Sequence, residues 1–304
     1  MEGVRLNMKT LQIKLKCEGN FLTPFQADTI FGHLCWAVAH KEGEKGIEGF
    51  LNPFKQGNPP FIISDGFPEG LLPKPIAGDY FFGNPEERKE WKKIEFLSFN
   101  DFNLIRNGEK CSFKGQDSLI KTSSVAHNTV NRLTNTTLEE GGVYTLKEMN
   151  FSSIAIYVKS ISEEWNNRIV DLFKELSKSG FGRKKSIGKG QFLVAEVRDF
   201  EFPSIAGPNG FVTLSNFCPA EDDPTEGFYK TIIKYGKLSE EYTFCGNPFK
   251  KPLLMIRTGS VFQTNVGPKE FYGRMITEGI SPAKPEVLHY AYAFAVPIKF
   301  SALA

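Results

Sequence analysis

A glycine- and lysine-rich segment in the second half of the chain has the composition best suited to binding an anion. Between Gly180 and Gly190 it holds four glycines and four cations in eleven residues. Glycine lets backbone amides approach an anion and adopts positive φ angles, while lysine and arginine neutralise phosphates. Phe181 and Arg183 also have flat side chains on which a base could stack. The predicted nucleic-acid contacts are Gly180, Phe181, Gly182, Arg183, Lys184, Lys185, Ser186, Gly188, Lys189 and Gly190.

This segment differs from a P-loop in both spacing and context. A P-loop has four residues between its first glycine and the Gly-Lys pair, which Ser or Thr follows. Here five residues separate Gly182 from Gly188, and Gly190 follows Lys189. The segment is also predicted to join a helix to a strand, which is the reverse of the P-loop order. A nucleotide triphosphatase is therefore disfavoured, and a plain helix cap would account for Gly180 but not for the four cations.

A second polar stretch, from Arg106 to Thr134, carries a local charge of +3. Its cations are Arg106, Lys110, Lys114, Lys121 and Arg132, against Glu109 and Asp117. Its polar side chains can hydrogen-bond phosphates, 2′-hydroxyls and unstacked bases. An ordinary surface loop explains the composition equally well from the residues alone. The candidate contacts are His127, Asn128, Asn131, Arg132 and Thr134.

Catalytic and metal-binding patterns are weak. His33 could act as a general acid or base, but no Tyr or Lys partner can be assigned to it from sequence. The five cysteines contain no C-x-x-C pair, and the acidic trio Glu221-Asp222-Asp223 reads as a solvated loop. We therefore predict no catalytic residue, no metal and no cofactor.

Two strand–helix–strand units are expected to position these residues. The first comprises a strand at 11–17, a helix at 24–41 and a strand at 61–65. The second comprises a strand at 154–158, a helix that Ser160 or Ser162 can cap and that ends before Gly180, and a strand at 192–197. This order is typical of the ferredoxin-like split βαβ pattern, which RNA-recognition motifs share. Residues 83–148 form a long insertion between the units. The glycine-rich loop then follows the second helix.

The predicted fold class is α+β with two ferredoxin-like (RRM-like, βαββαβ) domains, of which the second is degenerate. The first spans 1–202 with its insertion, and the second spans 210–304 after a Pro/Gly-rich linker. In the second we expect strands at 211–217, 253–258 and 290–298, and helices at 226–235 and 269–278. The alternating aromatic residues of the last strand fit a core strand better than a base-stacking platform.

Overall composition sets only broad limits. The 304 residues carry a formal net charge of +2, so any polyanion site must come from local clustering. The sequence shows no signal peptide and no apolar stretch long enough for a membrane span. Scattered cysteines are typical of free thiols in a reducing compartment, and we expect a cytoplasmic protein.

The glycine-rich loop and four further pieces of the chain resemble the RAMP proteins of CRISPR systems. The glycine-rich loop after the second helix of a ferredoxin-like domain is the signature of that superfamily. The further pieces are similar to the Csm-type RAMP of the Cas five-like group, and they are Asp28–Ala37, Ser64–Pro68 with Leu72–Pro75, His127–Thr134, and Gly259–Phe262. On this resemblance Thr29, His33 and Lys74, which lie in the matching pieces, join the candidate RNA contacts.

The resemblance implies a non-catalytic subunit of a type III-A (Csm) effector complex in antiviral defence. Such a subunit holds the repeat-derived 5′ tag of the crRNA. It contacts the large polymerase–cyclase subunit and the backbone RAMP subunit, and it meets target RNA only indirectly, through the guide. Two alternatives stay open: a metal-independent endoribonuclease that cleaves repeat RNA through His33, and the counterpart subunit of a type III-B complex.

Overall fold

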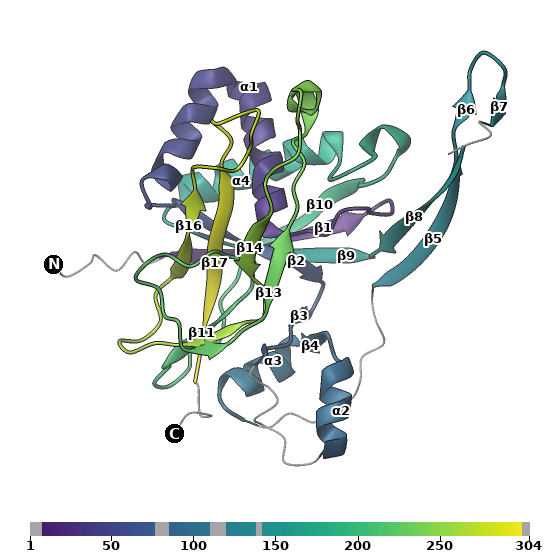
Figure 1. The fold of residues 1–304 in the computed structure, drawn as a ribbon. Helices are drawn as coiled ribbons and strands as arrows, with labels where there is room; N and C mark the ends of the chain where they lie inside the picture. Colours follow the sequence, from purple (N-terminus) through teal and green to yellow (C-terminus); the bar gives the residue numbers. More distant parts are fainter. Residues whose placement is uncertain (1–7, 77–84, 110–119, 138–141, 300–304) are drawn as a thin grey trace.

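The computed structural model describes residues 8–76, 85–109, 120–137 and 142–299. Within these ranges the chain forms a mixed α+β fold with several antiparallel sheets, which confirms the predicted class at that level (Figure 1). No helix in the same ranges has both the length and the apolar character needed to cross a membrane.

The first sheet comes from the two predicted strand–helix–strand units. Its elements are β1 (Lys9–Cys17), α1 (Ala27–Lys55), β2 (Phe61–Pro68), β9 (Ser153–Ser160), α4 (Glu163–Ser179) and β10 (Phe192–Asp199). The strands lie in the order β10-β1-β9-β2, and every neighbouring pair is antiparallel. Alternation in β1 buries Ile13 and Leu15, and the apolar stripe of α4 buries Ile169 and Phe173. The sheet and its two helices are therefore held by the periodic residues of the sequence.

Local signals set both ends of α4. The Ser162 side chain accepts a hydrogen bond from the Trp165 amide at 3.3 Å and begins α4. Gly180, with φ of 78°, ends it. Helix α1 continues beyond the predicted end near residue 41 and runs to Lys55, with a break at Gly43, where φ is 71°.

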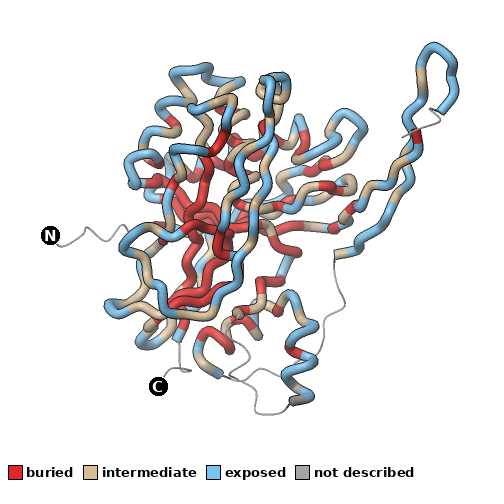
Figure 2. Tube along the Cα trace, viewed as in Figure 1, coloured by how far each residue is buried: buried red, intermediate tan, exposed pale blue. Residues whose placement is uncertain are grey.

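The insertion at 83–148 contains regular structure. Its described part, with the short strand before it, comprises β3 (Leu71–Pro73), α2 (Pro85–Lys93), β4 (Phe96–Ser98), α3 (Phe99–Arg106), β5 (Lys121–Asn128), β6 (Val130–Asn131), β7 (Thr136–Thr137) and β8 (Val143–Asn150). Strands β5 to β8 form a hairpin that projects away from the body of the molecule (Figure 1). Most of its residues are exposed (Figure 2).

Arg106 is a correction to the predicted basic stretch. Its side chain is 1% exposed, and its guanidinium donates to the Pro297 carbonyl at 2.8 Å and to Asn103 Oδ1 at 2.6 Å. It therefore ties α3 to the C-terminal part of the chain and is not a surface cation. Lys110, Lys114 and Asp117 lie outside the described residues.

The C-terminal part is built from strands. A five-stranded sheet has the order β12-β15-β11-β17-β16, and β13 and β14 form a separate two-stranded ribbon. The bounds are β11 (Gly210–Thr213), β12 (Gly227–Phe228), β13 (Thr231–Lys234), β14 (Leu253–Ile256), β15 (Val261–Gln263), β16 (Phe271–Ile276) and β17 (His289–Ile298). Two short 3₁₀ turns, η2 (Lys185–Ile187) and η3 (Glu240–Phe244), complete the described elements.

The helices predicted at 226–235 and 269–278 are wrong. The first region forms β12 and β13, and the second forms β16, which pairs along its length with β17. Short polar–apolar patterns fit both the helical and the strand period. Pairing with a fully buried neighbouring strand decides in favour of the strand. Gly273, with φ of 83°, also lies so close to β17 that a Cβ there would be 2.4 Å from the Ala291 carbonyl oxygen.

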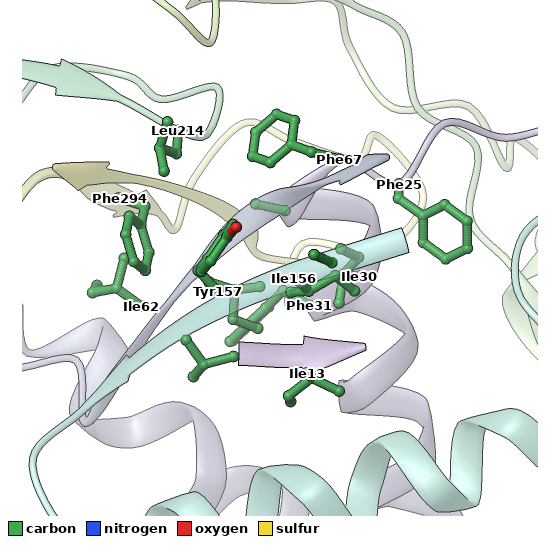
Figure 3. Packing of buried hydrophobic residues seen from close by; sticks show 14 of the residues in the cluster. Ile13, Phe25, Ile30, Phe31, Ile62, Phe67, Ile156, Tyr157, Leu214 and Phe294 are labelled. Carbon is green, nitrogen blue, oxygen red and sulfur yellow. The ribbon is translucent and has the colours of Figure 1, made fainter. Parts of the chain in front are cut away.

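One hydrophobic core joins both halves of the chain. Phe31 of α1 stacks on Tyr290 of β17 with ring centroids 4.7 Å apart, and the Tyr292 hydroxyl donates to the Phe54 carbonyl at 2.9 Å. Figure 3 shows Tyr157 of β9 and Phe294 of β17 in the same cluster. The aromatic strand is therefore a core strand, as the sequence favoured, and it fixes α1 against the C-terminal sheet.

Candidate nucleic-acid interface

The glycine-rich loop (residues 180–190) connects α4 to β10 through a series of left-handed residues. Gly180, Gly182, Gly188 and Gly190 have φ between 76° and 80°, and Lys184 has φ of 63°. A Cβ at Gly190 would lie 1.9 Å from the Phe181 carbonyl oxygen, so no other residue fits there. The predicted need for glycine at this position is thus both conformational and steric.

Most amides of the loop are engaged inside the protein. The Phe181 amide donates to the Gly190 carbonyl at 2.8 Å, and the Gly190 amide donates to the Asn20 carbonyl at 2.9 Å. The Gly182 amide donates to His33 Nε2 at 3.1 Å, and the Arg183 amide donates to Thr23 Oγ1 at 3.2 Å. These bonds hold the shape of the loop and leave few amides for a ligand.

The groups that face outward lie in the middle of the loop. Within the described part of the chain, the amides of Lys184, Lys185 and Ser186, at the start of η2, have no acceptor. The side chains of Arg183 and Lys184 are exposed, and those of Lys185 and Lys189 are half-buried. A phosphate approaching the loop would therefore meet Arg183 and Lys184 first.

Phe181 is not a stacking surface for a base, contrary to the prediction. It is 1% exposed, and its ring stacks on Phe25 with centroids 4.3 Å apart and planes at 7°. The His33 ring lies 4.9 Å from it on another side. Phe181 anchors the loop in the core because the chain reverses direction just after α4 and buries the first apolar residue it meets.

His33 supports the loop from α1. Its Nε2 accepts the Gly182 amide, so the ring is held as the neutral tautomer with the proton on Nδ1. Burial, with help from Lys185, lowers the pKa of His33 to about 4. A neutral ring with its acceptor nitrogen engaged positions the loop and is poorly placed to act as an acid or base at neutral pH.

Glu148 joins the loop to the β5–β8 hairpin, and sequence reasoning missed it. Its fully buried carboxylate lies 2.7 Å from Lys189 Nζ and 3.2 Å from His127 Nε2, and it accepts from Asn20 Nδ2 at 2.7 Å. Burial opposes its ionisation, but hydrogen bonds from Lys189, Asn20 and His127 outweigh this effect and lower the pKa of Glu148. No sequence spacing marks this residue, since its partners come from three other segments.

A second contact between loop and hairpin lies beside the first. Lys184 Nζ is 5.5 Å from the centroid of the Tyr144 ring, and His127 stacks on the same ring at 5.6 Å. The fold therefore brings together two segments that the sequence separates, the glycine-rich loop and the β5–β8 hairpin. Asn128, Asn131, Arg132 and Thr134 lie further out on the same hairpin.

A second glutamate reaches the loop from the C-terminal part. Glu240 Oε1 lies 2.8 Å from Lys185 Nζ, and the hydrogen bond from Lys185 lowers the pKa of Glu240. Glu240 has φ of 51°, which is unusual outside glycine. Two of the four loop cations are therefore paired with carboxylates.

Thr29 and Lys74 lie apart from this interface. Thr29 Oγ1 accepts from Lys234 Nζ at 3.3 Å, beside an ion pair between Lys234 and Asp28. Lys74 donates to the Trp91 carbonyl and lies 4.8 Å from the centroid of the Trp91 ring, at the end of the molecule that carries α2 and α3 (Figure 1). The fold does not bring these two predicted residues to the loop. In the described ranges, no group of three or more His, Cys, Asp or Glu side chains is arranged to hold a metal ion.

Comparisons with known proteins found relatives in sequence and in fold. No family model matches the chain. The "CRISPR system Cms protein Csm4" of Thermococcus onnurineus (strain NA1) is 25% identical over 230 residues, which are 70% of this chain and 76% of that protein. The fold resembles a chain of the Csm1–Csm4 cassette in complex with cA4, with a TM-score of 0.66 and 20% identity over 96% of this chain and 98% of that one. It resembles a chain of the Csm3–Csm4 subcomplex in the type III-A interference complex equally well, with a TM-score of 0.66 and 15% identity over 96% of this chain and 100% of that one.

Csm4 is the component that both structures share with the sequence relative. This chain is Csm4-like in sequence and in fold. The predicted resemblance to the type III-A RAMP subunits is confirmed at this level. The likeness in fold extends over 96% of the chain.

Proposed function

We propose that this Csm4-like chain is a non-catalytic RNA-binding subunit of a type III-A CRISPR (Csm) complex in the cytoplasm. In this proposal it holds the repeat-derived 5′ tag of a crRNA. The observation that carries the proposal is the pairing of two features at one place: exposed Arg183 and Lys184 on a rigid glycine-rich loop, and a projecting hairpin packed against that loop.

The electrostatics of the interface support the RNA assignment. Single-stranded nucleic acid is held by cations that follow its backbone and by nearby groups that contact its bases. Arg183 and Lys184 supply unpaired positive charge in the described structure, and the three amides at the start of η2 supply donors. The proposed partners for nucleotides next to the tag phosphates lie on the hairpin. They are Tyr144 and His127, with Asn128, Asn131, Arg132 and Thr134 beyond them.

The proposed partners follow from the relatives. The similar structures are a Csm1–Csm4 cassette and a Csm3–Csm4 subcomplex. We propose that this chain likewise contacts a Csm1-type large subunit and a Csm3-type backbone subunit. Target RNA would then be met only through base pairing with the guide.

The proposed domain division also supports this role. Strand order β10-β1-β9-β2 with α1 and α4 is the arrangement of a ferredoxin-like domain, and we assign residues 1–202 to it. Residues 210–304 would form the second, degenerate domain around the five-stranded sheet. In that division the loop belongs to the first domain and Glu240 to the second.

The experiment that tests the RNA assignment removes the two exposed cations. In the variant Arg183→Ala with Lys184→Ala, we expect about tenfold weaker binding of a repeat-derived tag RNA, and a slope of log K against log salt smaller by about 1.4. Fluorescence anisotropy over a salt series measures both quantities. The control is Lys92→Ala with Lys93→Ala on α2, which removes two cations away from the loop.

Unchanged affinity and slope in the loop variant would count against the assignment. The same preparation also tests the alternative that the protein is an endoribonuclease. Site-specific cleavage of repeat RNA in the presence of a chelator, lost in His33→Ala, would identify a metal-independent endoribonuclease. Intact RNA with loosened binding in His33→Ala is the result expected here, because His33 holds the loop through the Gly182 amide.

A further inference from the structure

The ribbon formed by β13 and β14 presents its apolar side chains to solvent. Ile233 and Leu254 are directly opposite each other on the two strands and are 53% and 65% exposed. Tyr235 follows two residues after Ile233, on the same face, and is 72% exposed. Phe249, 60% exposed, continues this stripe next to Lys237, whose Nζ lies 5.7 Å from its ring centroid. Four large apolar side chains thus form one exposed face, a feature that marks interaction sites.

The opposite face of the same ribbon carries buried charge. Lys234 points inward and lies 2.9 Å from the Asp28 carboxylate at the start of α1. Lys250 is also half-buried, and burial lowers its pKa. The inner face thus holds two lysines beside Ile232, Leu253 and Met255, while Ile233 and Leu254 point to solvent.

The fold fixes which face of the β13–β14 ribbon points outward. A slip of one residue would turn every side chain of a strand to the other face. Such a slip would break the ion pair between Lys234 and Asp28 and leave a buried carboxylate without its partner. The inner face is also held by Met255, which is 1% exposed and packs with Ile232. The packing of the inner face therefore holds the apolar stripe on the outer face of the ribbon.

The charges around the stripe are mostly positive. Between residues 229 and 257 the exposed cations outnumber the exposed anions by four to one. The cations are Lys230, Lys237, Lys251 and Arg257, and the anion is Glu241. A partner surface that complements this face has apolar side chains at its centre and carboxylates around them.

We propose that the outward face of the β13–β14 ribbon (Ile233, Tyr235, Phe249 and Leu254) docks a protein subunit with an apolar centre and an acidic rim. The proposal rests on the proposed function, which places the chain in a multisubunit complex. RNA would also suit cations and aromatic rings, but half of this face is aliphatic, since Ile233 and Leu254 pair directly across the ribbon. Bases stack on aromatic planes and gain little from Ile or Leu, so a protein is the better fit.

The test uses the full chain with a Csm1-type and a Csm3-type subunit. The variant Ile233→Thr with Leu254→Thr keeps strand propensity and allows a cross-strand Thr pair, so the ribbon should still form. We expect it to bind one of the two subunits at least tenfold more weakly, measured by biolayer interferometry, with unchanged affinity for tag RNA. The matched control is Ile161→Thr with Val266→Thr, two other exposed apolar residues.

A second variant tests the charge of the rim. Lys237→Glu with Arg257→Glu should weaken binding of the same subunit, and the loss should shrink at high salt because rim charges are screened. Wild-type affinity of both variants for both subunits would overturn the docking assignment while leaving the proposed function intact. Loss of RNA affinity with intact subunit binding would also overturn it, and would make the face a nucleic-acid surface. If the unmodified chain bound neither subunit, the proposed complex and the docking surface would both fail.

Discussion

At the scale of single residues, two glutamates set how much charge the glycine-rich loop offers. Glu148 pairs with Lys189 from within the protein, and Glu240 pairs with Lys185 from the C-terminal part. Each carboxylate occupies a cation that a phosphate could otherwise contact. The sequence shows four cations in this loop. In the folded protein, two of them have no carboxylate partner among the described residues.

Glu240 should compete with RNA for Lys185. In Glu240→Gln the side chain keeps its shape but loses its charge, so Lys185 becomes available to a phosphate and the loop gains net charge. We expect tag RNA to bind about two- to fivefold more tightly at low salt, measured by fluorescence anisotropy. The neighbouring exposed Glu241→Gln serves as control, and an unchanged or weaker affinity in Glu240→Gln would contradict the competition.

Gly188 and Gly190 should differ sharply in how well they tolerate substitution by alanine, although both have positive φ. A Cβ at Gly188 meets nothing within 4 Å, whereas one at Gly190 would lie 1.9 Å from the Phe181 carbonyl oxygen. Gly188→Ala should cost about 1–2 kcal/mol from the backbone alone. Gly190→Ala should unfold the loop and lower RNA affinity at least tenfold. Thermal unfolding and anisotropy measure the two effects, and equal behaviour of the two variants would argue against the steric role of Gly190.

At the scale of elements, the start of α1 is capped from β2. The Ala27 amide donates to Asp65 Oδ1 at 2.8 Å, and Asp65 is 5% exposed. Burial raises the pKa of Asp65 from 3.8 to about 7, against the effect of the Ala27 hydrogen bond. The helix that supports the loop through His33 is thus anchored by a carboxyl group that titrates near neutral pH.

Asp65 should make the protein less stable as pH rises. Its pKa is higher in the folded than in the unfolded state, so its stabilising contribution is complete below about pH 4 and is lost as pH rises through about 7. Asp65→Asn keeps the acceptor for the Ala27 amide and removes the titration. We expect urea unfolding to show the variant more stable than the wild type by at least about 1 kcal/mol at pH 8 but not at pH 4. A constant difference across this range would contradict the pKa shift.

At the scale of the whole molecule, Arg106 connects three distant parts. Its guanidinium donates to the Pro297 carbonyl in β17 and, at 3.3 Å, to the Pro203 carbonyl in the linker, while α3 supplies its backbone. Burial lowers its pKa to about 10, which leaves it charged at neutral pH. Arg106 therefore holds the insertion, the linker and the C-terminal sheet in one arrangement.

Replacing Arg106 should affect stability and not RNA affinity. In Arg106→Leu the two proline carbonyls lose a buried charged donor, and we expect the free energy of unfolding to fall by about 2–3 kcal/mol. Urea unfolding measures the change, and the exposed Arg132→Leu on the hairpin is the control. A loss of RNA affinity in the folded Arg106 variant would instead support the sequence prediction that Arg106 belongs to a basic RNA-binding stretch.

The sequence by itself determined the features that depend on neighbouring residues. The alternation in β1, the end of α4 at Gly180, and the need for glycine between 180 and 190 all follow from periodicity, capping and allowed φ angles. Those signals predicted the first sheet, its two helices and the loop. They did not predict β16 in place of a helix, because pairing with β17 decides that segment.

Only the tertiary structure decided which of the predicted residues are available to RNA. Phe181 is buried against Phe25, Arg106 is buried beneath the C-terminal sheet, and Lys189 is paired with Glu148. The partners in the loop contacts with Glu148 and His33 are 41 and 149 residues apart in the chain. No local pattern encodes such pairs, because burial and ion pairing depend on how the finished layers meet. The same reason explains why the outward apolar face of β13 and β14 could be found only in the folded molecule.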